Sequence, residues 1–486
     1  MKRRRMRAAG LCLLLAPLVA CTTVGPDYEL PKDSAFAQVA QRPVALDAHR
    51  SAAVDPAQAA VEGRWWELYD DPKLNALVEQ ALQANAELKV AAARLTQAQA
   101  RYAQVGAASH PAVGVEAAVG RSRVSAQSLL QPEPLPVFNF ASGGISASYQ
   151  LDLFGKLRRA AEAAHDQAQA VQAAGDLARI SIAAQVVGAY VEICHGNHEL
   201  AVARHSLELQ QRSRDVIARL QAAGRGSPVA VARADAQAAT LQAALPPLAA
   251  RRQAAGYELA ALLGRTPDQV PPEALACEDA PELKQPIPVG DGAALLRRRP
   301  DVRRAERELA AATAEIGVAT AALYPDITLG ASIGANGMLE DFGKPVTQQW
   351  SIGPLISWSI PNGGAQARVE LTRAGAQAAL AEFDHVVLEA LRETQTVLDR
   401  YAEDLRRVAA LREARGHADT AAADTRRIHQ AGRVSYLSSL DAQRTLAAAE
   451  ASLASAEAQV SQDQIRLFLA LGGGWQAQAA SAPAQP

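Results

Sequence analysis

A long internal repeat is the feature that most restricts how this chain can fold. Residues 85–120 align without a gap onto residues 299–334, 214 positions later. Each copy passes from an alanine-rich helical pattern, through Pro111 or Pro325, into the alternating pattern of a strand. The two halves of the chain are therefore expected to build similar structures.

Two short turn sequences repeat in the same way. The sequence Gly-Arg-Val-Ser at 432–435 matches Gly-Arg-Gly-Ser at 224–227, with an offset of 208 positions. A unit of about 210 residues is far longer than the unit of a solenoid. The pattern predicts two tandem structural repeats, at 65–284 and 285–474, related by a pseudo-symmetry axis.

Residues 1–20 are typical of a secretory signal peptide. A basic start precedes an apolar stretch, Leu11 to Ala20, that is too short to span a bilayer as a stable helix. The stretch runs into Cys21 with a sequence that resembles a bacterial lipobox, which implies cleavage before Cys21 and lipidation of this residue. Thr22 is not aspartate, so the resemblance favours the outer membrane. An ordinary signal peptide followed by a chance cysteine is the alternative. No later apolar run is expected to approach the roughly 20 residues that a membrane helix needs.

Four cysteines are present, and Cys12 and Cys21 belong to the leader and the lipidation motif. Cys194 and Cys277 remain in the mature chain. Because the periplasm is oxidising, we expect these two residues to form a disulfide. Two buried free thiols are the alternative. No CxxC pair or His/Cys cluster indicates a metal, and the histidines beside Cys194 have no fourth ligand nearby in the sequence.

The composition and motifs exclude several classes of function. The net charge of −2 gives no basic surface for nucleic acid. No GxSxG, P-loop or HExxH motif is present, so no enzyme class is indicated and no cofactor is expected. Aromatic residues make up only 4% of the chain, which favours closely packed long helices over a large aromatic core.

Four segments alternate between apolar and small polar residues, a pattern typical of strands. They lie at about 111–124, 140–154, 325–336 and 346–360. About ten residues is the length that a tilted strand needs to cross a bilayer. Aromatic residues near the segment ends suit a membrane interface: Phe138, Phe140, Phe154, Tyr324 and Trp350. A water-facing sheet over a soluble core is the alternative.

The remaining sequence is helical on a large scale. Residues 156–220 and 363–430 contain no proline, and about 65 helical residues make a rod of about 100 Å. Return helices are predicted at 228–263 and 436–471. The first of these is expected to kink or break at Pro246-Pro247.

The two ends of the mature chain lack such periodicity. Residues 21–64 are rich in proline and alanine and are expected to form a lipidated, partly extended arm. Gly472 and the glycines after it read as the stop of the last helix, and residues 475–486 are expected to be a disordered tail.

Four strands cannot close a barrel, for which eight strands are about the lower limit. An open sheet in lipid leaves two edges of unpaired backbone groups, each costing several kcal/mol. Copies of the chain are therefore expected to share one barrel. A dimer gives eight strands with a filled or narrow lumen, and a trimer gives twelve strands with a bore.

Several motifs resemble the NodT-type lipoprotein branch of the TolC-like outer-membrane factors. They are Val-Gly-Pro-Asp-Tyr at 24–28, Trp-Trp at 65–66, Asp-Pro-Lys-Leu at 71–74, Leu-Asp-Leu-Phe-Gly at 151–155, Leu-Leu-Arg-Arg-Arg-Pro-Asp-Val at 295–302 and the turn stretch 432–443. The resemblance covers roughly residues 22–474, and it departs at Ala86, where the family usually has proline. It implies an α+β membrane protein, a homotrimer with a twelve-stranded β-barrel in the outer membrane and a periplasmic tube of twelve helices.

The resemblance also implies a function. Members of this family are exit ducts of tripartite efflux pumps, docked to a periplasmic adaptor and an inner-membrane pump of the RND type. They pass drugs or other small toxic compounds and are not enzymes. Two alternatives stay open: a duct for type I protein secretion, and a non-conducting periplasmic scaffold lipoprotein.

By the same resemblance, the turns at 224–228 and 432–436 lie at the far end of the tube and contact the adaptor. The residues implied in this contact are Gly224, Arg225, Ser227, Gly432, Arg433 and Ser435. Since glycine supplies the backbone freedom that a turn needs, a plain helix connection without a partner is the alternative.

The resemblance places the channel gate beside the second turn. Leu437 and Asp441 are four residues apart and share a helix face, and Val229 and Arg233 occupy the equivalent places in the first repeat. In a trimer a leucine ring can block water and ions, and an aspartate ring favours cations. We expect Arg233 and Asp441 to lie near each other and hold the tip shut. A merely solvated carboxylate is the alternative.

Overall fold

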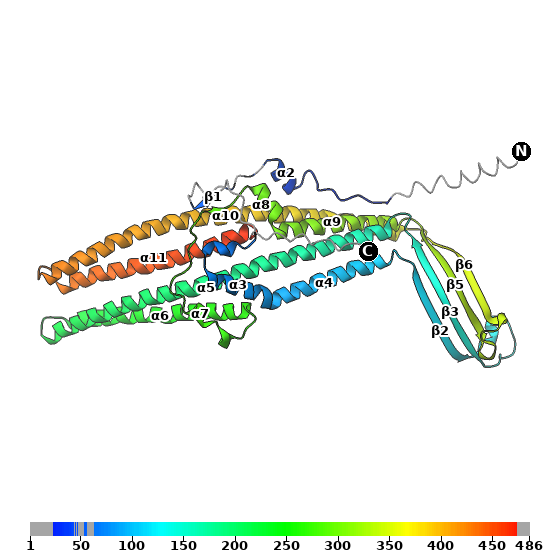
Figure 1. Cartoon of the computed structure of the whole chain (residues 1–486), viewed down its shortest axis with the longest axis horizontal. Coiled ribbons are helices and arrows are strands. Elements are labelled where there is room, and N and C mark those ends of the chain that lie inside the picture. Colours follow the sequence, from blue (N-terminus) through cyan, green and yellow to red (C-terminus); the bar gives the residue numbers. More distant parts are fainter. Residues whose placement is uncertain (1–22, 43, 45, 47–52, 56–62, 474–486) are drawn as a thin grey trace. The chain divides into compact units, whose positions relative to one another are not determined.

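The computed structural model describes residues 23–42, 44, 46, 53–55 and 63–473 (Figure 1). The signal peptide, Cys21 and the predicted tail at 475–486 lie outside the described residues. The chain divides into two compact units. Unit 1 is Met1–Pro31, Arg94–Val171 and Arg304–Phe383, and unit 2 is Lys32–Ala93, Gln172–Arg303 and Asp384–Pro486.

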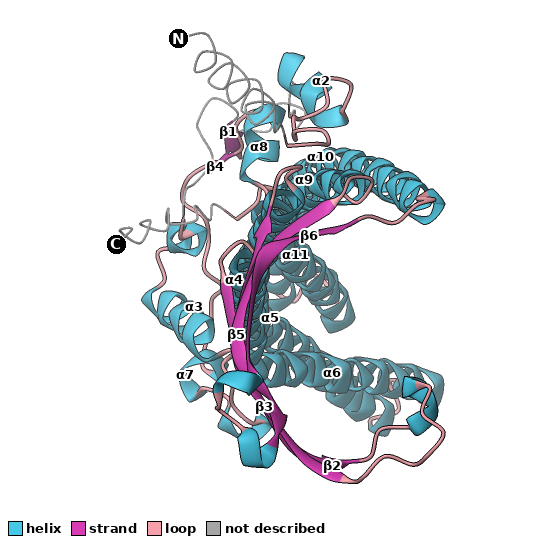
Figure 2. Ribbon diagram, turned by 90° about the vertical axis from the view of Figure 1, so that its right-hand side faces the viewer, coloured by secondary structure: helices cyan, strands magenta, loops and turns pink. Residues whose placement is uncertain are grey.

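Unit 1 contains an antiparallel sheet with the strand order β2-β3-β5-β6 (Figure 2). The strands are β2 (Ala112–Ser122), β3 (Phe138–Leu151), β5 (Asp326–Met338) and β6 (Gln348–Ser357). Short 3-10 turns lie between them, at η3 (Ala126–Leu129), η5 (Leu339–Asp341) and η6 (Pro345–Thr347). β2 and β6 each pair on one side only, so the sheet has two open edges.

One strand is shorter than the alternation predicts. The pattern continues to residue 360, but β6 ends at Ser357, opposite Asp326 of β5. The residue before Asp326 is Pro325, which has no N–H to donate to a ladder. Residues 358–360 therefore have no strand partner in the part of the chain that the structure describes.

The register sorts the side chains of the sheet onto two faces. One row across the four strands joins Val115, Ile145, Ile333 and Trp350, and the next joins Gly114, Ser146, Ser332 and Ser351. The apolar row is not packed on a core, since Ile333 is 67% and Trp350 76% exposed. An uncovered apolar face opposite a face of small polar residues suits lipid on one side and water on the other. It argues against the alternative of a sheet over a soluble core.

The two copies of the long repeat adopt the same local structure. Helix α9 (Pro300–Ala321) begins and ends 214 positions after α4 (Ala86–Ala107), and each leads into a strand. Asn85 caps α4, since its Oδ1 accepts a hydrogen bond from the Glu87 N–H at 2.8 Å. The capped start forms although Ala86 stands where the second repeat has Pro300.

The longest helices are α5 (Lys156–Ala222) and α10 (Gly363–Gln430), which Figure 1 shows with their return helices α6 (Pro228–Leu262) and α11 (Tyr436–Ala470). Within unit 2, Arg251 of α6 forms an ion pair with Glu199 of α5 at 2.6 Å. Arg412 of α10 pairs with Glu457 of α11 at 2.8 Å. The sequence thus forms two helical hairpins of nearly equal length.

Helix α6 runs through Pro246 and Pro247 without interruption. The predicted break is therefore wrong. Both prolines are exposed, so water can solvate the carbonyls whose helical donors they remove.

The N-terminal arm contains a helix that the sequence pattern does not predict. Helix α2 (Ala35–Gln41) begins where Ser34 Oγ accepts from the Ala37 N–H at 3.2 Å and Asp384 accepts from the Ala35 N–H at 2.7 Å. Because Asp384 is distant in the sequence, this cap cannot be predicted from the residues around α2. The other elements of unit 2 are β1 (Val54–Asp55), η2 (Trp65–Tyr69), α3 (Pro72–Ala84), η4 (Pro267–Gln269), α7 (Pro272–Leu275), β4 (Ile287–Pro288) and α8 (Gly292–Arg298).

One 18-residue window within α5 is apolar enough to span a membrane by length and composition, with a mean hydropathy of 1.4. The prediction that no run after the leader is so apolar is therefore wrong. This window is 61% buried in the structure. Ile182 and Ile193 of α5 lie in the core of unit 2, where Trp65 stacks on Phe468 with a centroid distance of 4.6 Å. Burial among neighbouring helices accounts for the apolar stretch.

Candidate functional site

The two hairpin turns have the same backbone geometry. Gly224 and Gly432 adopt positive φ angles of 70° and 73°. The N–H groups of Arg225 and Arg433 donate to Leu220 O at 2.8 Å and Ile428 O at 3.1 Å. This is the Schellman pattern, in which a left-handed glycine lets the residue after it satisfy a terminal helix carbonyl.

A serine starts each return helix. Ser227 Oγ accepts from the Val229 N–H at 3.2 Å, and Ser435 Oγ accepts from the Ser438 N–H at 3.1 Å. Arg225 and Arg433 lie between the glycine and the serine, and both are exposed. The glycines and serines therefore build the turns and leave the arginines free to meet a partner.

The four predicted gate residues lie on the return helices, just after these turns. Val229 is 60% and Leu437 47% exposed, and Arg233 and Asp441 are also exposed. Within the described part of one chain, Arg233 and Asp441 form no ion pair. The expected closeness of these two residues therefore stays a proposal.

The structure places two further residues beside the turns. Gln210, only 1% exposed on α5, donates to Ala234 O of α6 at 3.0 Å and accepts from Arg444 Nε of α11 at 2.7 Å. One side chain thus joins three helices from both hairpins. The sequence signal for a buried polar contact is the stripe of Ser206, Gln210 and Ser213, because these polar residues recur at helical spacing in an alanine-rich helix.

A groove of about 470 Å³ lies between α5 and the α10/α11 hairpin. His429, Gln430 and Tyr436 beside the second turn line it, together with His205 and Arg212 of α5. The lining of the groove includes both charged and apolar side chains.

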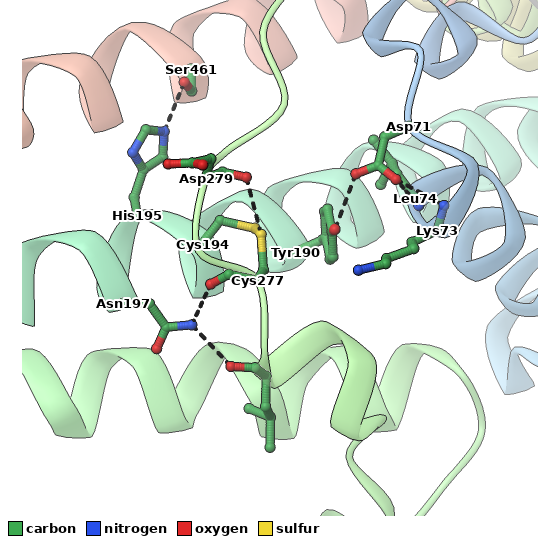
Figure 3. Close-up of a disulfide and its surroundings, with 11 residues drawn as sticks. Asp71, Lys73, Leu74, Tyr190, Cys194, His195, Asn197, Cys277, Asp279 and Ser461 are labelled. Carbon is green, nitrogen blue, oxygen red and sulfur yellow. Dashed lines mark hydrogen bonds between the residues drawn. A yellow bond between two sulfur atoms is a disulfide. The ribbon is translucent and has the colours of Figure 1, made fainter. Parts of the chain in front are cut away.

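A disulfide joins Cys194 of α5 to Cys277, which follows α7 (Figure 3). Asn197 supports the same crossing, because its Nδ2 donates to Leu275 O at 2.9 Å and Cys277 O at 2.7 Å. The bond closes a separation of 83 residues and fixes the segment after α7 onto α5.

The pKa values of an aspartate and a histidine in unit 2 are strongly shifted. Burial, together with the neighbouring Asp404, raises the pKa of Asp463 to about 6. Burial lowers the pKa of His195 to about 4, and His198 and Arg251 add to this effect. Figure 3 shows His195 turned towards Ser461, whose Oγ lies 2.9 Å from its Nε2. In the ranges that the structure describes, no group of three or more His, Cys, Asp or Glu residues could hold a metal ion.

The first described residues are held against unit 1 by a cluster of contacts. The Val24 N–H donates to Phe154 O at 3.1 Å, and Arg159 forms an ion pair with Asp27 at 2.6 Å. Gly25 adopts a φ of 90° beside Gly317, where a Cβ on Gly25 would lie 2.4 Å from the Gly317 Cα. This cluster fixes the chain a few residues after Cys21, next to the junction of β3 and α5.

Comparison with known proteins gives the same family throughout. The family model described as outer membrane efflux protein matches residues 77–265 and 293–473. Nodulation protein T of Rhizobium leguminosarum bv. viciae is 31% identical, over 99% of this chain and 95% of its own length. The pyoverdine export outer membrane protein OpmQ of Pseudomonas aeruginosa is 29% identical, over 98% of both chains.

Among solved structures, the outer-membrane channel OprN superposes with a TM-score of 0.84 and 34% identity, over 93% of this chain and 99% of its own. The residues that the family model matches include the four strands and both hairpins. The chain therefore belongs to the outer membrane efflux protein family and is an outer-membrane protein.

Proposed function

We propose that three copies of this chain form the exit duct of a tripartite efflux pump. The observation that carries the proposal is the open four-stranded sheet, with an apolar face, a small polar face and two unpaired edges. Such a sheet is stable in lipid only when copies close it, because each unpaired backbone group there costs several kcal/mol. Three copies give twelve strands, which leave a water-filled bore.

The polar face of the sheet supports a duct for uncharged or cationic small molecules. Its central rows carry glycine and serine, and Glu116 is the charged residue of these rows. Small side chains keep a bore wide, and they offer no specific pocket for a cargo. The name of the relative OpmQ states pyoverdine export, and this also supports small cargo over secreted protein.

The hairpin turns support docking to a periplasmic adaptor and, through it, to an inner-membrane pump of the RND type. Arg225 and Arg433 are exposed on capped turns, and the groove lies beside the second turn. Replacing Gly432 with valine should abolish drug resistance, because a β-branched residue cannot adopt its φ of 73° without strain. Trimer assembly should persist in this variant. Gly416→Val is the matched control, since Gly416 lies within α10, is exposed and has open space around it.

The gate is proposed at Leu437 and Asp441, with Val229 and Arg233 of a neighbouring chain facing them. Asp441→Ala should raise single-channel conductance in planar bilayers because it removes the charge that holds the closed tip together. Asp419→Ala removes an exposed aspartate from α10 instead and should leave conductance unchanged. Equal conductance of the two variants would count against the gate.

Cys21 is proposed as the lipidation site. The cluster of contacts around Val24 and Asp27 places the chain just after Cys21 beside the end of β3, where the strand is followed by helix α5. Labelled palmitate should be incorporated into the native protein and not into Cys21→Ser. Label retained in the variant would show that another residue carries the lipid.

The test of function compares a deletion strain with its parent. Loss of the chain should lower the inhibitory concentrations of several drugs and leave the set of secreted proteins unchanged. The opposite result would favour a duct for protein secretion. A purified protein that forms no conducting trimer would leave only the scaffold alternative.

A further inference from the structure

Strand β3 is paired with β5 over a longer stretch than with β2. β3 pairs with β2 only as far as Ser148, opposite Ala112, but it pairs with β5 as far as Leu151, opposite Ile327. Residues 149–151 are therefore strand only because a strand from the other repeat lies beside them.

The two hairpins have the same internal register. In the first, Ala112 faces Ser148, and in the second, Asp326 faces Ser357. Asp326 is the repeat equivalent of Ala112, 214 positions later, so Ser357 is the equivalent of Ser148, 209 positions later. Every residue of β6 can thus be matched to one of β3.

This match identifies the residues that β6 lacks. The equivalents of Tyr149, Gln150 and Leu151 are Trp358, Ser359 and Ile360. They follow the end of β6 and keep the same order of aromatic, polar and aliphatic side chains. Trp358 is 53% and Ile360 72% exposed. By the two-residue alternation of a strand, both lie on the same apolar face as Trp350 and Ile356 of β6.

We infer that β6 pairs with β2 of a second copy in the register that β3 uses with β5 inside one chain. In the chain, Ala147 faces Ala331. The equivalent contact places Ile356 opposite Ala117 of the partner subunit. Trp358 and Ile360 then lie opposite the partner subunit's Val115 and the partner subunit's Val113, and β6 extends to Ile360. Pro361 ends it, because proline donates no ladder hydrogen bond.

The chemistry of the strands fits this register. It keeps apolar side chains on one face across the boundary, and it sets Trp358 against a valine, an aromatic and β-branched pair of the kind that stabilises sheets. A slip of one residue would turn Trp358 to the small polar face. A slip of two residues would keep the faces, so the experiment must separate registers that differ by two.

Paired cysteines make this separation. Directly opposed residues of antiparallel strands have Cα atoms about 4.5–5.5 Å apart, inside the range of a disulfide, whereas diagonal neighbours at about 7–8 Å exceed it. Cys194 and Cys277 are already bonded to each other and do not compete. Three double variants should be oxidised in outer membranes: Ile356→Cys with Ala117→Cys, with Val115→Cys, and with Val119→Cys. The corresponding single variants are the controls.

The register predicts covalent dimers and trimers mainly from the Ile356/Ala117 pair, with at least about tenfold less product from the other two. Most product from the Val115 or Val119 pair would overturn it. So would absence of product from all three pairs in protein that is trimeric. The inference rests on the proposed trimer, and sedimentation of the same samples separates the two failures: trimers with the wrong cross-link refute only the register, and monomers refute the shared barrel itself.

Hydrogen exchange gives a second measurement without mutation. Amides at 358–360 should exchange as slowly as those at 149–151 in the assembled protein, because both segments then lie in a ladder. Fast exchange at 358–360 beside slow exchange at 149–151 would contradict the extension of β6.

Discussion

Arg444 on α11 donates a hydrogen bond from Nε to Oε1 of Gln210 on α5 at 2.7 Å, and the two hairpins are thereby joined near their turns. Gln210 is buried and also binds the backbone of α6 at Ala234. A bond from a charged donor in such a place contributes about 1.5–3 kcal/mol. If the tip opens by separation of the hairpins, this contact resists opening.

Replacing Arg444 with methionine should therefore loosen the closed tip. Methionine keeps much of the aliphatic volume and removes the donor. We expect conductance in planar bilayers to rise about twofold or more, since the closed state loses about 1.5–3 kcal/mol relative to the open one. Arg412→Met is the matched control, because Arg412 binds Glu457 within one hairpin and does not join the two. Equal conductance of both variants would show that the Gln210 contact is structural only.

Glu116→Gln should reduce the preference of the channel for cations. Glu116 lies in the row of Gly144, Gly334 and Gln349, and three copies would place a ring of carboxylates in an otherwise uncharged part of the bore. The reversal potential in a salt gradient should shift towards zero. Glu133→Gln, in the loop after β2, should leave it in place. A shift of the same size from both variants would mean that the bore is lined differently.

Asp463→Asn should change how stability depends on pH. Because the pKa of Asp463 is raised to about 6, the folded protein holds a proton that the unfolded chain releases near pH 4. This group stabilises the fold below about pH 4 and loses that contribution as pH rises to about 6. The variant should therefore be more stable than the native protein at pH 7, on the order of 1–3 kcal/mol, and equally stable at pH 4. Thermal melts across this range would measure the difference, and parallel curves would contradict it.

His195→Gln should have the opposite dependence. The pKa of His195 is lowered to about 4, so its neutral form stabilises the fold above about pH 6.5, and that contribution is lost as pH falls towards 4. Glutamine can still bind Ser461 but does not titrate. Relative to the native protein, this variant should gain stability as pH falls from about 6.5 to 4. No relative gain would show that folding does not lower the pKa of His195.

Removal of the disulfide should destabilise unit 2. The Cys194–Cys277 bond closes a separation of 83 residues, and native disulfides of this kind contribute about 2–5 kcal/mol. Cys194→Ser with Cys277→Ser should lower the thermal midpoint, and the native protein should fall to a similar value after reduction. An unchanged midpoint would show that Asn197 and the surrounding packing hold the segment unaided.

The sequence predicts repeated or strictly periodic features well. The strands follow from alternation, and the turns follow from the glycine and serine that recur near 224 and 432. Features that depend on distant partners are not predicted. The cap on α2 comes from Asp384, the role of Gln210 requires three helices, and the end of β6 depends on which strand lies beside residue 358. The break at Pro246 and Pro247 was mispredicted for a related reason. The free-energy cost of a proline within a helix depends on whether water reaches the carbonyls that lose their helical donors.

The number of copies in a lipid-embedded particle tests the central claim most directly. Light scattering can measure the molar mass of the purified protein in nanodiscs, with the lipid mass subtracted. A protein mass of three chains, each of 51.1 kDa before any removal of the predicted leader, is the expected result, because only shared strands close the sheet. A mass of one chain in particles that keep the fold would contradict it.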